Sequence, residues 1–165
     1  MKVVKSEIPL ESITNQYLPA DYEDTFVCKI SKDSQLTPDD VMVRFWTDFP
    51  AWVDFLFRIR NFLVKFMGLE GSMQSLQELE DCIRTGRQCS IASVPAKNEN
   101  ETLLLLDDKH LSARMSVYVE RLPVCQQVYA ITLVHFKNKL GRIYFFFVRP
   151  FHKIIVKSIL KRTVK

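Results

Sequence analysis

Apolar side chains recur at intervals of three and four residues over the last quarter of the chain, the spacing that gathers them on one face of a helix. The positions are Leu140, Ile143, Phe147, Phe151, Ile154, Ile155, Ile159 and Leu160. They predict a long C-terminal helix in which Pro150 is tolerated as a kink. The stretch from Arg142 to Arg149 is also aromatic and β-prone, so a final strand there is the alternative, ranked second to the helix.

A strong helix start lies in the first third of the chain. Thr37 supplies a capping hydroxyl, Pro38 suits the first helical position, and Asp39 and Asp40 place two carboxylates in the first turn. The pattern predicts a helix from this point to about Asp48.

Two more helices are predicted before the chain changes character. Pro50 starts a second helix whose apolar positions keep helical spacing as far as Gly68. Three further phenylalanines make it apolar around much of its circumference, so we expect it to be buried on more than one side or to line something apolar. A short polar helix is predicted within Ser72 to Thr85, ended by Gly86.

The other segments have the composition of strands separated by turns. Between Leu111 and Val119 apolar and polar residues alternate, so one strand face is expected in the core and the other, with Arg114, Ser116 and Tyr118, in water. With no internal repeat or low-complexity linker, we expect a single domain over residues 1–165. The predicted strands, arranged as an antiparallel meander after the first, are Tyr22 to Ile30, Ser90 to Val94, Glu101 to Leu106, Leu111 to Arg121 and Val124 to Lys137.

Charge is unevenly distributed along the chain. The net charge is +4, yet Lys137 to Lys165 holds nine Lys or Arg and no Asp or Glu. A basic end can attract phosphate, nucleic acid or an anionic membrane surface. Because its cations are interleaved with the apolar stripe, we interpret them as the solvated flank of a helix. Weak contact with an anionic surface remains open, and no specific nucleic-acid binding is expected.

The four cysteines form no C-x-x-C pair and no zinc pattern. We interpret them as buried, reduced thiols of a cytosolic protein. The N-terminus lacks the apolar region of a signal peptide, and no stretch of about twenty residues is free of charges. We therefore expect a cytoplasmic protein without a transmembrane segment.

Four segments carry a resemblance to a known family: FVCKI, VMVRFW, DDKHLSARMSVYVE and NKLGRIYFFFVRPFHKIIVKSIL. They resemble DUF2867, a largely bacterial family of unknown function. The order of elements is similar to the helix-grip arrangement of the START-like superfamily, also called SRPBCC or Bet v 1-like. The resemblance implies an α+β fold in which a curved antiparallel sheet wraps around a long C-terminal helix, with two helices inserted after the first strand. It also implies a hydrophobic cavity between sheet and helix, and no particular reaction.

Residues able to carry chemistry are few. The three histidines stand in no metal motif, and glycine loops for nucleotide phosphates are missing, so we expect no metal and no cofactor. His110 follows Asp108, which can orient an imidazole or, as we prefer, bond the amides of a turn. Arg44 has Asp40 and Asp48 four residues away on either side, which favours an intrahelical salt bridge over a ligand anion.

The leading hypothesis is a module that binds a small hydrophobic molecule or lipid in an apolar pocket between the sheet, the second helix and the last helix. The alternatives are a small enzyme of the cyclase or hydrolase type that uses His110, His135 or a carboxylate, and a protein or membrane-surface interaction module that uses the basic terminal helix. The oligomeric state and the ligand stay open. The candidate ligand-binding residues are Arg44, Arg114, Tyr118, Tyr129, His135, Tyr144, Phe147 and Phe151.

Overall fold

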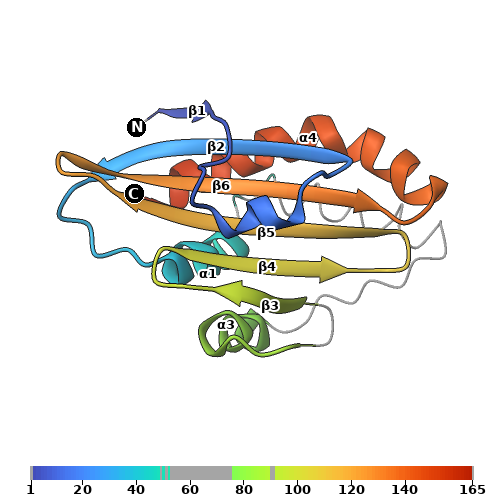
Figure 1. Ribbon diagram of the computed structural model, residues 1–165, viewed down its shortest axis with the longest axis horizontal. Coiled ribbons are helices and arrows are strands. Elements are labelled where there is room, and N and C mark those ends of the chain that lie inside the picture. Colours follow the sequence, from blue (N-terminus) through green and yellow to red (C-terminus); the bar gives the residue numbers. More distant parts are fainter. Residues whose placement is uncertain (1, 49, 51, 53–75, 90–91, 165) are drawn as a thin grey trace.

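A six-stranded antiparallel sheet forms the centre of the protein, in the order β1-β2-β6-β5-β4-β3 (Figure 1). The computed structural model describes residues 2–48, 50, 52, 76–89 and 92–164. The strands are β1 (Val3–Lys5), β2 (Tyr22–Ser31), β3 (Ala92–Lys97), β4 (Glu101–Asp107), β5 (Leu111–Arg121) and β6 (Cys125–Phe136). The helices are α1 (Pro38–Thr47), α3 (Leu76–Thr85) and α4 (Lys139–Thr163), with a 3-10 turn η1 (Ile13–Tyr17).

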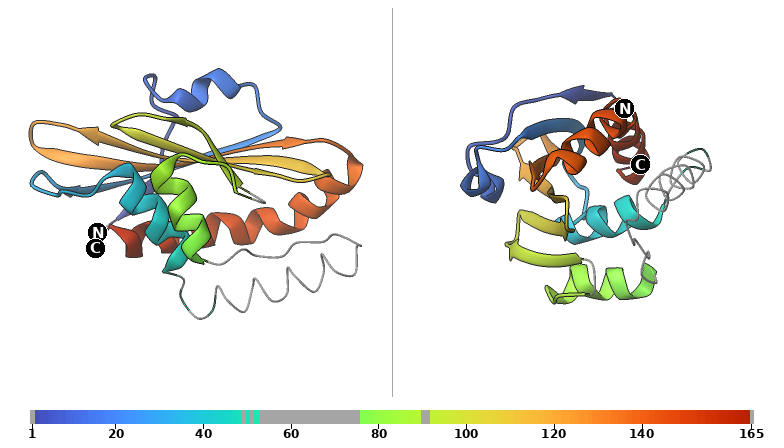
Figure 2. Two further views of the ribbon diagram at one scale, coloured as in Figure 1. Left: turned by 90° about the horizontal axis from the view of Figure 1, so that it is seen from below. Right: turned by 90° about the vertical axis from the view of Figure 1, so that its right-hand side faces the viewer.

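The two faces of the sheet have different covers. Helices α1, α3 and α4 lie on one side, called the inner face below, and the N-terminal segment with η1 crosses the other, the outer face (Figure 2). The sheet curves around α4, so the α+β helix-grip prediction is confirmed. The short strand β1 was not predicted; it extends the sheet edge by pairing with Phe26 to Cys28 of β2.

The first helix begins where the sequence predicts. The Thr37 side chain accepts from the amide of Asp40, and the Asp40 carboxylate accepts from the amide of Thr37, which satisfies two of the free donors of the first turn. Helix α3 ends before Gly86, whose φ of 69° is the left-handed conformation that glycine adopts most readily. The second predicted helix, Pro50 to Gly68, lies almost entirely outside the described residues.

Helix α4 confirms the preferred prediction for the C-terminal segment and excludes a strand over 142–149. Asn138 caps it by accepting from the amide of Gly141 at 3.0 Å. Gly141 is required by close approach, since a Cβ there would lie 2.2 Å from the carbonyl oxygen of His110. Pro150 is inside the helix and exposed, so its missing amide donor is on the solvent side.

The core changes along α4. After Pro150, the side chains of Val156, Ile159 and Leu160 are at most 1% exposed and pack into the main core with α1 and the middle of the sheet. Before Pro150, Phe145 packs in a smaller and more aromatic cluster with Tyr22, Leu111 and Val134. We call these two parts the Ile-rich half and the aromatic half of α4.

The outer face of β5 corrects a prediction. The residues expected in water include Ser116 and Tyr118, which are 0% and 5% exposed. The N-terminal segment buries them and is fixed by the Glu101 carboxylate, itself 0% exposed. That carboxylate accepts from the hydroxyl of Ser12 at 2.7 Å, the amide of Ile13 at 2.7 Å and the hydroxyl of Ser116 at 2.5 Å. A buried carboxylate needs such partners, and strand alternation alone cannot predict them.

The cysteines also differ in part from the prediction. Cys82 and Cys89 form a disulfide, with their Cα atoms 6.1 Å apart, because the turn at Gly86 folds the chain back toward the end of α3. The prediction of reduced thiols is therefore wrong for this pair. Cys28 and Cys125 are free, and Cys28 is buried.

Candidate functional site

The sequence-predicted site residues fall into separate places. Arg114 and His135 lie on the outer face, where an Arg114 guanidinium nitrogen is 3.2 Å from His135 Nδ1. His135 Nε2 is 3.1 Å from the carbonyl oxygens of both Tyr17 and Pro19. Both of these partners can only accept, so Nε2 carries a proton and Nδ1 is free to accept from Arg114. The Arg114 guanidinium also lies over the Tyr17 ring, 4.6 Å from its centroid. The pair thus fastens the N-terminal segment.

Tyr118 and Tyr129 are neighbours on the same outer face, with ring centroids 5.8 Å apart. They form a small cluster with Val27 and Ile131. Burial, followed by the hydrogen bond that its hydroxyl donates to Glu120 at 3.1 Å, raises the pKa of Tyr129 to about 12. Both tyrosines lie on the face opposite α4.

Arg44 does not form the salt bridge that its spacing predicts. Asp40 pairs with Arg84 at 3.1 Å and Asp48 pairs with Arg162 at 2.9 Å. The exposed Arg44 instead donates to the carbonyl oxygen of Thr163 at 3.3 Å, at the end of α4. The intrahelical prediction is wrong because cations from other elements lie closer to both carboxylates.

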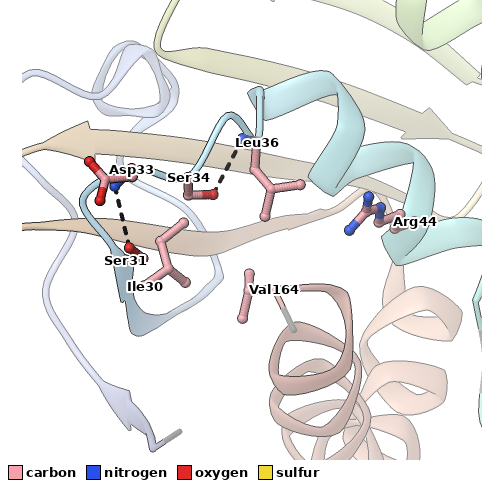
Figure 3. A pocket seen from close by; sticks show the side chains of 7 residues that line it. All are labelled: Ile30, Ser31, Asp33, Ser34, Leu36, Arg44 and Val164. Atoms are coloured by element: carbon pink, nitrogen blue, oxygen red, sulfur yellow. Dashed lines mark hydrogen bonds between the residues drawn. The ribbon is translucent and has the colours of Figure 1, made fainter.

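Arg44 also borders an open hollow of about 490 Å³ beside the last turn of α4 (Figure 3). Its walls come from the β2–α1 connection and from Val164. Local bonds within that connection, from the amide of Asp33 to Ser31 and from the amide of Leu36 to Ser34, define its shape. The hollow is at the opposite end of α4 from the aromatic half.

His110 has the structural role preferred from the sequence. Asp108 Oδ1 accepts from the amide of His110 at 2.6 Å and from the amide of Leu111 at 2.9 Å, which closes the β4–β5 turn. The His110 ring faces Asn138, the N-cap of α4. Among the described residues, no group of three His, Cys, Asp or Glu side chains is arranged to hold a metal ion.

The remaining predicted residues belong to the aromatic half of α4. Tyr144 is partly buried against the cluster of Tyr22 and Phe145. Phe147 and Phe151 point outward and are 64% and 50% exposed. Of the eight predicted residues, only Tyr144 therefore packs on the inner face of the sheet beneath the aromatic half.

A polar cluster that the sequence did not predict lies at this position. Asp24, 3% exposed, projects from the inner face of β2 and accepts from the hydroxyl of Tyr22 at 2.5 Å. Its Oδ2 is 3.5 Å from Nε2 of His152, which comes from α4. Thr132 is its cross-strand partner on β6. We call Tyr22, Asp24, Thr132 and His152 the inner polar cluster.

The hydrogen bonds of the inner polar cluster are incomplete. Asp24 Oδ1, Thr132 Oγ1 and His152 Nε2 are buried and have no hydrogen-bond partner among the residues that the structure describes. Most buried polar atoms in native proteins are satisfied, because leaving one unpaired costs about 1–3 kcal/mol. Three unpaired atoms at one carboxylate are therefore unfavourable for folding alone, and a function at this position would account for them.

The carboxylate of the inner polar cluster is held in its charged form. Burial alone would raise the pKa of Asp24, but the nearby imidazole of His152 and the hydroxyl of Tyr22 outweigh it and lower the pKa. Burial and the adjacent Asp24 raise the pKa of Tyr22, so its hydroxyl stays a proton donor to the carboxylate. An anionic acceptor thus lies inside an aromatic environment.

Aromatic rings surround the inner polar cluster. Phe145 lies 4.7 Å from the Tyr22 ring, 5.7 Å from Phe136 and 6.1 Å from His152, measured between centroids. The guanidinium of Arg149 lies over the Tyr22 ring at 5.2 Å. Apolar surface with a few convergent polar groups is the usual composition of a small-molecule site.

The sequence contains a signal for Asp24 that can be read in retrospect. Tyr22, Asp24, Phe26, Cys28 and Ile30 alternate along β2 and share its inner face. A single carboxylate in such a row must find partners, or it would not be buried. His152 carries no comparable signal, because its partner is 128 positions earlier in the chain.

Comparison with known proteins identifies the family. The family described as protein of unknown function (DUF2867) matches residues 17–159. The chain belongs to this family. The match includes every residue of the inner polar cluster and most of α4. No curated protein and no solved structure matches the chain. Within the described residues, no helix is both long and apolar enough to cross a membrane.

Proposed function

We propose that this domain binds a small, mostly apolar molecule beneath the aromatic half of α4, and that the inner polar cluster receives the polar group of that molecule. The observation that carries the proposal is a set of three buried atoms, on Asp24, Thr132 and His152, inside a cluster of aromatic rings. None of the three has a hydrogen-bond partner in the described part of the chain. An apolar pocket holds its ligand mainly through burial, and a few polar groups fix the orientation.

The charges of the cluster indicate which polar group fits. The free oxygen of Asp24 is an anionic acceptor, so the ligand group must be a donor. A hydroxyl group suits the site, because it can donate to Asp24 and accept from Thr132 at the same time. A carboxylate or phosphate on the ligand would be repelled by Asp24.

The walls of the site favour a flat or aromatic ligand. Tyr22 and Phe145 present rings to each other in a tilted arrangement, and Phe136 adds a third ring. Ala113 and Tyr144 next to them are only partly buried.

A matched pair of probes tests the proposal: 2-naphthol, which has one hydroxyl, and 2-methoxynaphthalene, which lacks the donor. We expect the wild-type protein to bind 2-naphthol about tenfold or more tightly than 2-methoxynaphthalene, since an unpaired buried acceptor disfavours the ether. Fluorescence titration measures both affinities. The variant Asp24→Asn should lose the preference, whereas Asp33→Asn, on the wall of the distant hollow, should keep it. Equal binding of both probes to the wild type, or no binding, contradicts the proposal.

Acid–base catalysis is a second candidate function, favoured by the 3.5 Å approach of His152 to a buried carboxylate. A carboxylate of this kind can orient an imidazole that moves a proton. His152 replaces His110 and His135 as the candidate base, because those two face an amide side chain and backbone carbonyls. The ester 2-naphthyl acetate separates the two functions. A binding module leaves it intact, whereas release of 2-naphthol by the wild type but not by Asp24→Asn would establish catalysis.

A further inference from the structure

Exposed apolar side chains are concentrated on one helix. Ten large apolar side chains are exposed among the described residues, and five of them lie on α4. The spacing of three, four, eight and eleven residues from the first places all five on one helical face. We call this the outer stripe; it consists of Ile143 (55% exposed), Phe146 (72%), Phe147 (64%), Phe151 (50%) and Ile154 (58%).

The outer stripe is unusual for a water-exposed helix. Single exposed apolar residues are common, but a contiguous row of large ones marks a contact surface. His152 and Phe145 turn toward the sheet from the same part of α4, so the stripe is the opposite side of this helix. The sheet therefore does not cover the outer stripe.

A row of cations borders the outer stripe. Arg142, Arg149 and Lys157 follow one another at about two helical turns, on the side of α4 that meets β2 and the end of β6. Each is over an aromatic ring of the sheet, at 5.7 Å from Phe136, 5.2 Å from Tyr22 and 5.0 Å from Phe26 respectively. Such contacts support the side chains while all three residues remain exposed.

We propose that α4 docks on an anionic lipid surface, with the outer stripe inserted at the level of the headgroups and the cation row contacting lipid phosphates. Large apolar residues beside a basic flank are the composition of helices that lie in the membrane interface. Residues 137–165 contain nine cations and no anion, so the helix matches a negatively charged surface in charge.

The same features disfavour two other occupants. A second copy of this chain would bring two basic helices together, and the like charges would repel. Nucleic acid would match the charge, but Ile143 and Ile154 cannot stack on bases, and the phosphate backbone does not require an apolar row.

Vesicle co-sedimentation of the full chain tests the proposal. We expect binding to vesicles of phosphatidylcholine mixed with phosphatidylserine, weaker binding at high salt, and little binding to phosphatidylcholine alone. Neutralising Lys157 of the cation row together with Lys161, the exposed lysine one turn later on α4, as Lys157→Gln and Lys161→Gln, should weaken the binding about tenfold or more. The matched control, Lys29→Gln with Lys32→Gln, changes two exposed cations of β2 and its turn and should bind as wild type.

The apolar contribution needs its own pair of variants. Phe146→Ser with Phe147→Ser should reduce vesicle binding about tenfold or more, since both side chains are largely exposed and insert in the proposed complex. Leu10→Ser with Val124→Ser removes two even more exposed apolar side chains elsewhere and should leave vesicle binding unchanged. Circular dichroism shows whether each variant is folded.

Three results would overturn docking on lipid. The protein could bind both kinds of vesicle equally, or it could fail to sediment with the anionic vesicles at low salt. It could also bind single-stranded RNA while it binds no vesicles. Docking does not depend on the proposed ligand site. Asp24→Asn should bind vesicles as the wild type does, so failure of one proposal leaves the other testable.

Discussion

The two halves of α4 use the same helix for different tasks. After Pro150 the helix presents aliphatic side chains to a dry core, and Ile159 and Leu160 are 0% exposed. Before Pro150 it presents Phe145 to an aromatic cluster, with the buried charge of Asp24 nearby. The difference shows that length and amphipathicity alone do not assign a role to a helix. The role of each half is decided by the residues of the sheet that its buried side contacts.

The largest expected difference concerns folding stability. Ile159→Ala creates a cavity in the main core and should lower the free energy of unfolding by about 2–5 kcal/mol. Phe147→Ala removes a bulkier side chain that is 64% exposed, so it should change that free energy by no more than about 0.5 kcal/mol. Urea denaturation measures both. If the two variants lost similar amounts of unfolding free energy, the distinction between the two halves of α4 would be wrong.

A smaller effect sharpens the role of Asp24. Its pKa is lower in the folded state, so its charge contributes stability that is fully present above about pH 4 and is lost as pH falls through the folded-state pKa. Asp24→Asn should therefore lose less stability than the wild type when the pH is lowered below about 4. Urea midpoints measured across pH check this.

The matched control for the acid experiment is Glu23→Gln. Glu23 is the exposed neighbour of Asp24 in β2 and points away from α4. It should retain the acid dependence of the wild type. If Asp24→Asn also retains it, the carboxylate is not held by His152 and Tyr22 as described.

The fold was largely predictable from local patterns. The Thr37 capping box, the alternation in Leu111–Arg121 and the helical spacing after Leu140 correctly predicted α1, β5 and α4. The strand β1 was missed, because three residues are too few for a period to appear. The outer face was misjudged, since nothing local shows that the N-terminal segment crosses it and is tied to Glu101.

The candidate site was much less predictable. Sequence reasoning chose Arg114, Tyr118, Tyr129 and His135, which share the outer face with the N-terminal segment. Their ligand-binding roles stay predictions, and the four residues lie on the face of the sheet opposite α4. Asp24 and His152 meet only through the packing of α4 on β2, and such long-range pairs have no periodic signal.

The central claim is that a ligand binds beneath the aromatic half of α4 and leaves the Ile-rich half unaffected. Titration of the ¹⁵N-labelled protein with 2-naphthol, followed by two-dimensional amide spectra, tests this most directly. The account predicts the largest shift changes at Tyr22 to Asp24, Thr132 and the helix from Tyr144 to His152. Changes centred on the hollow of Ile30, Leu36 and Val164, or changes spread evenly along α4, would contradict it.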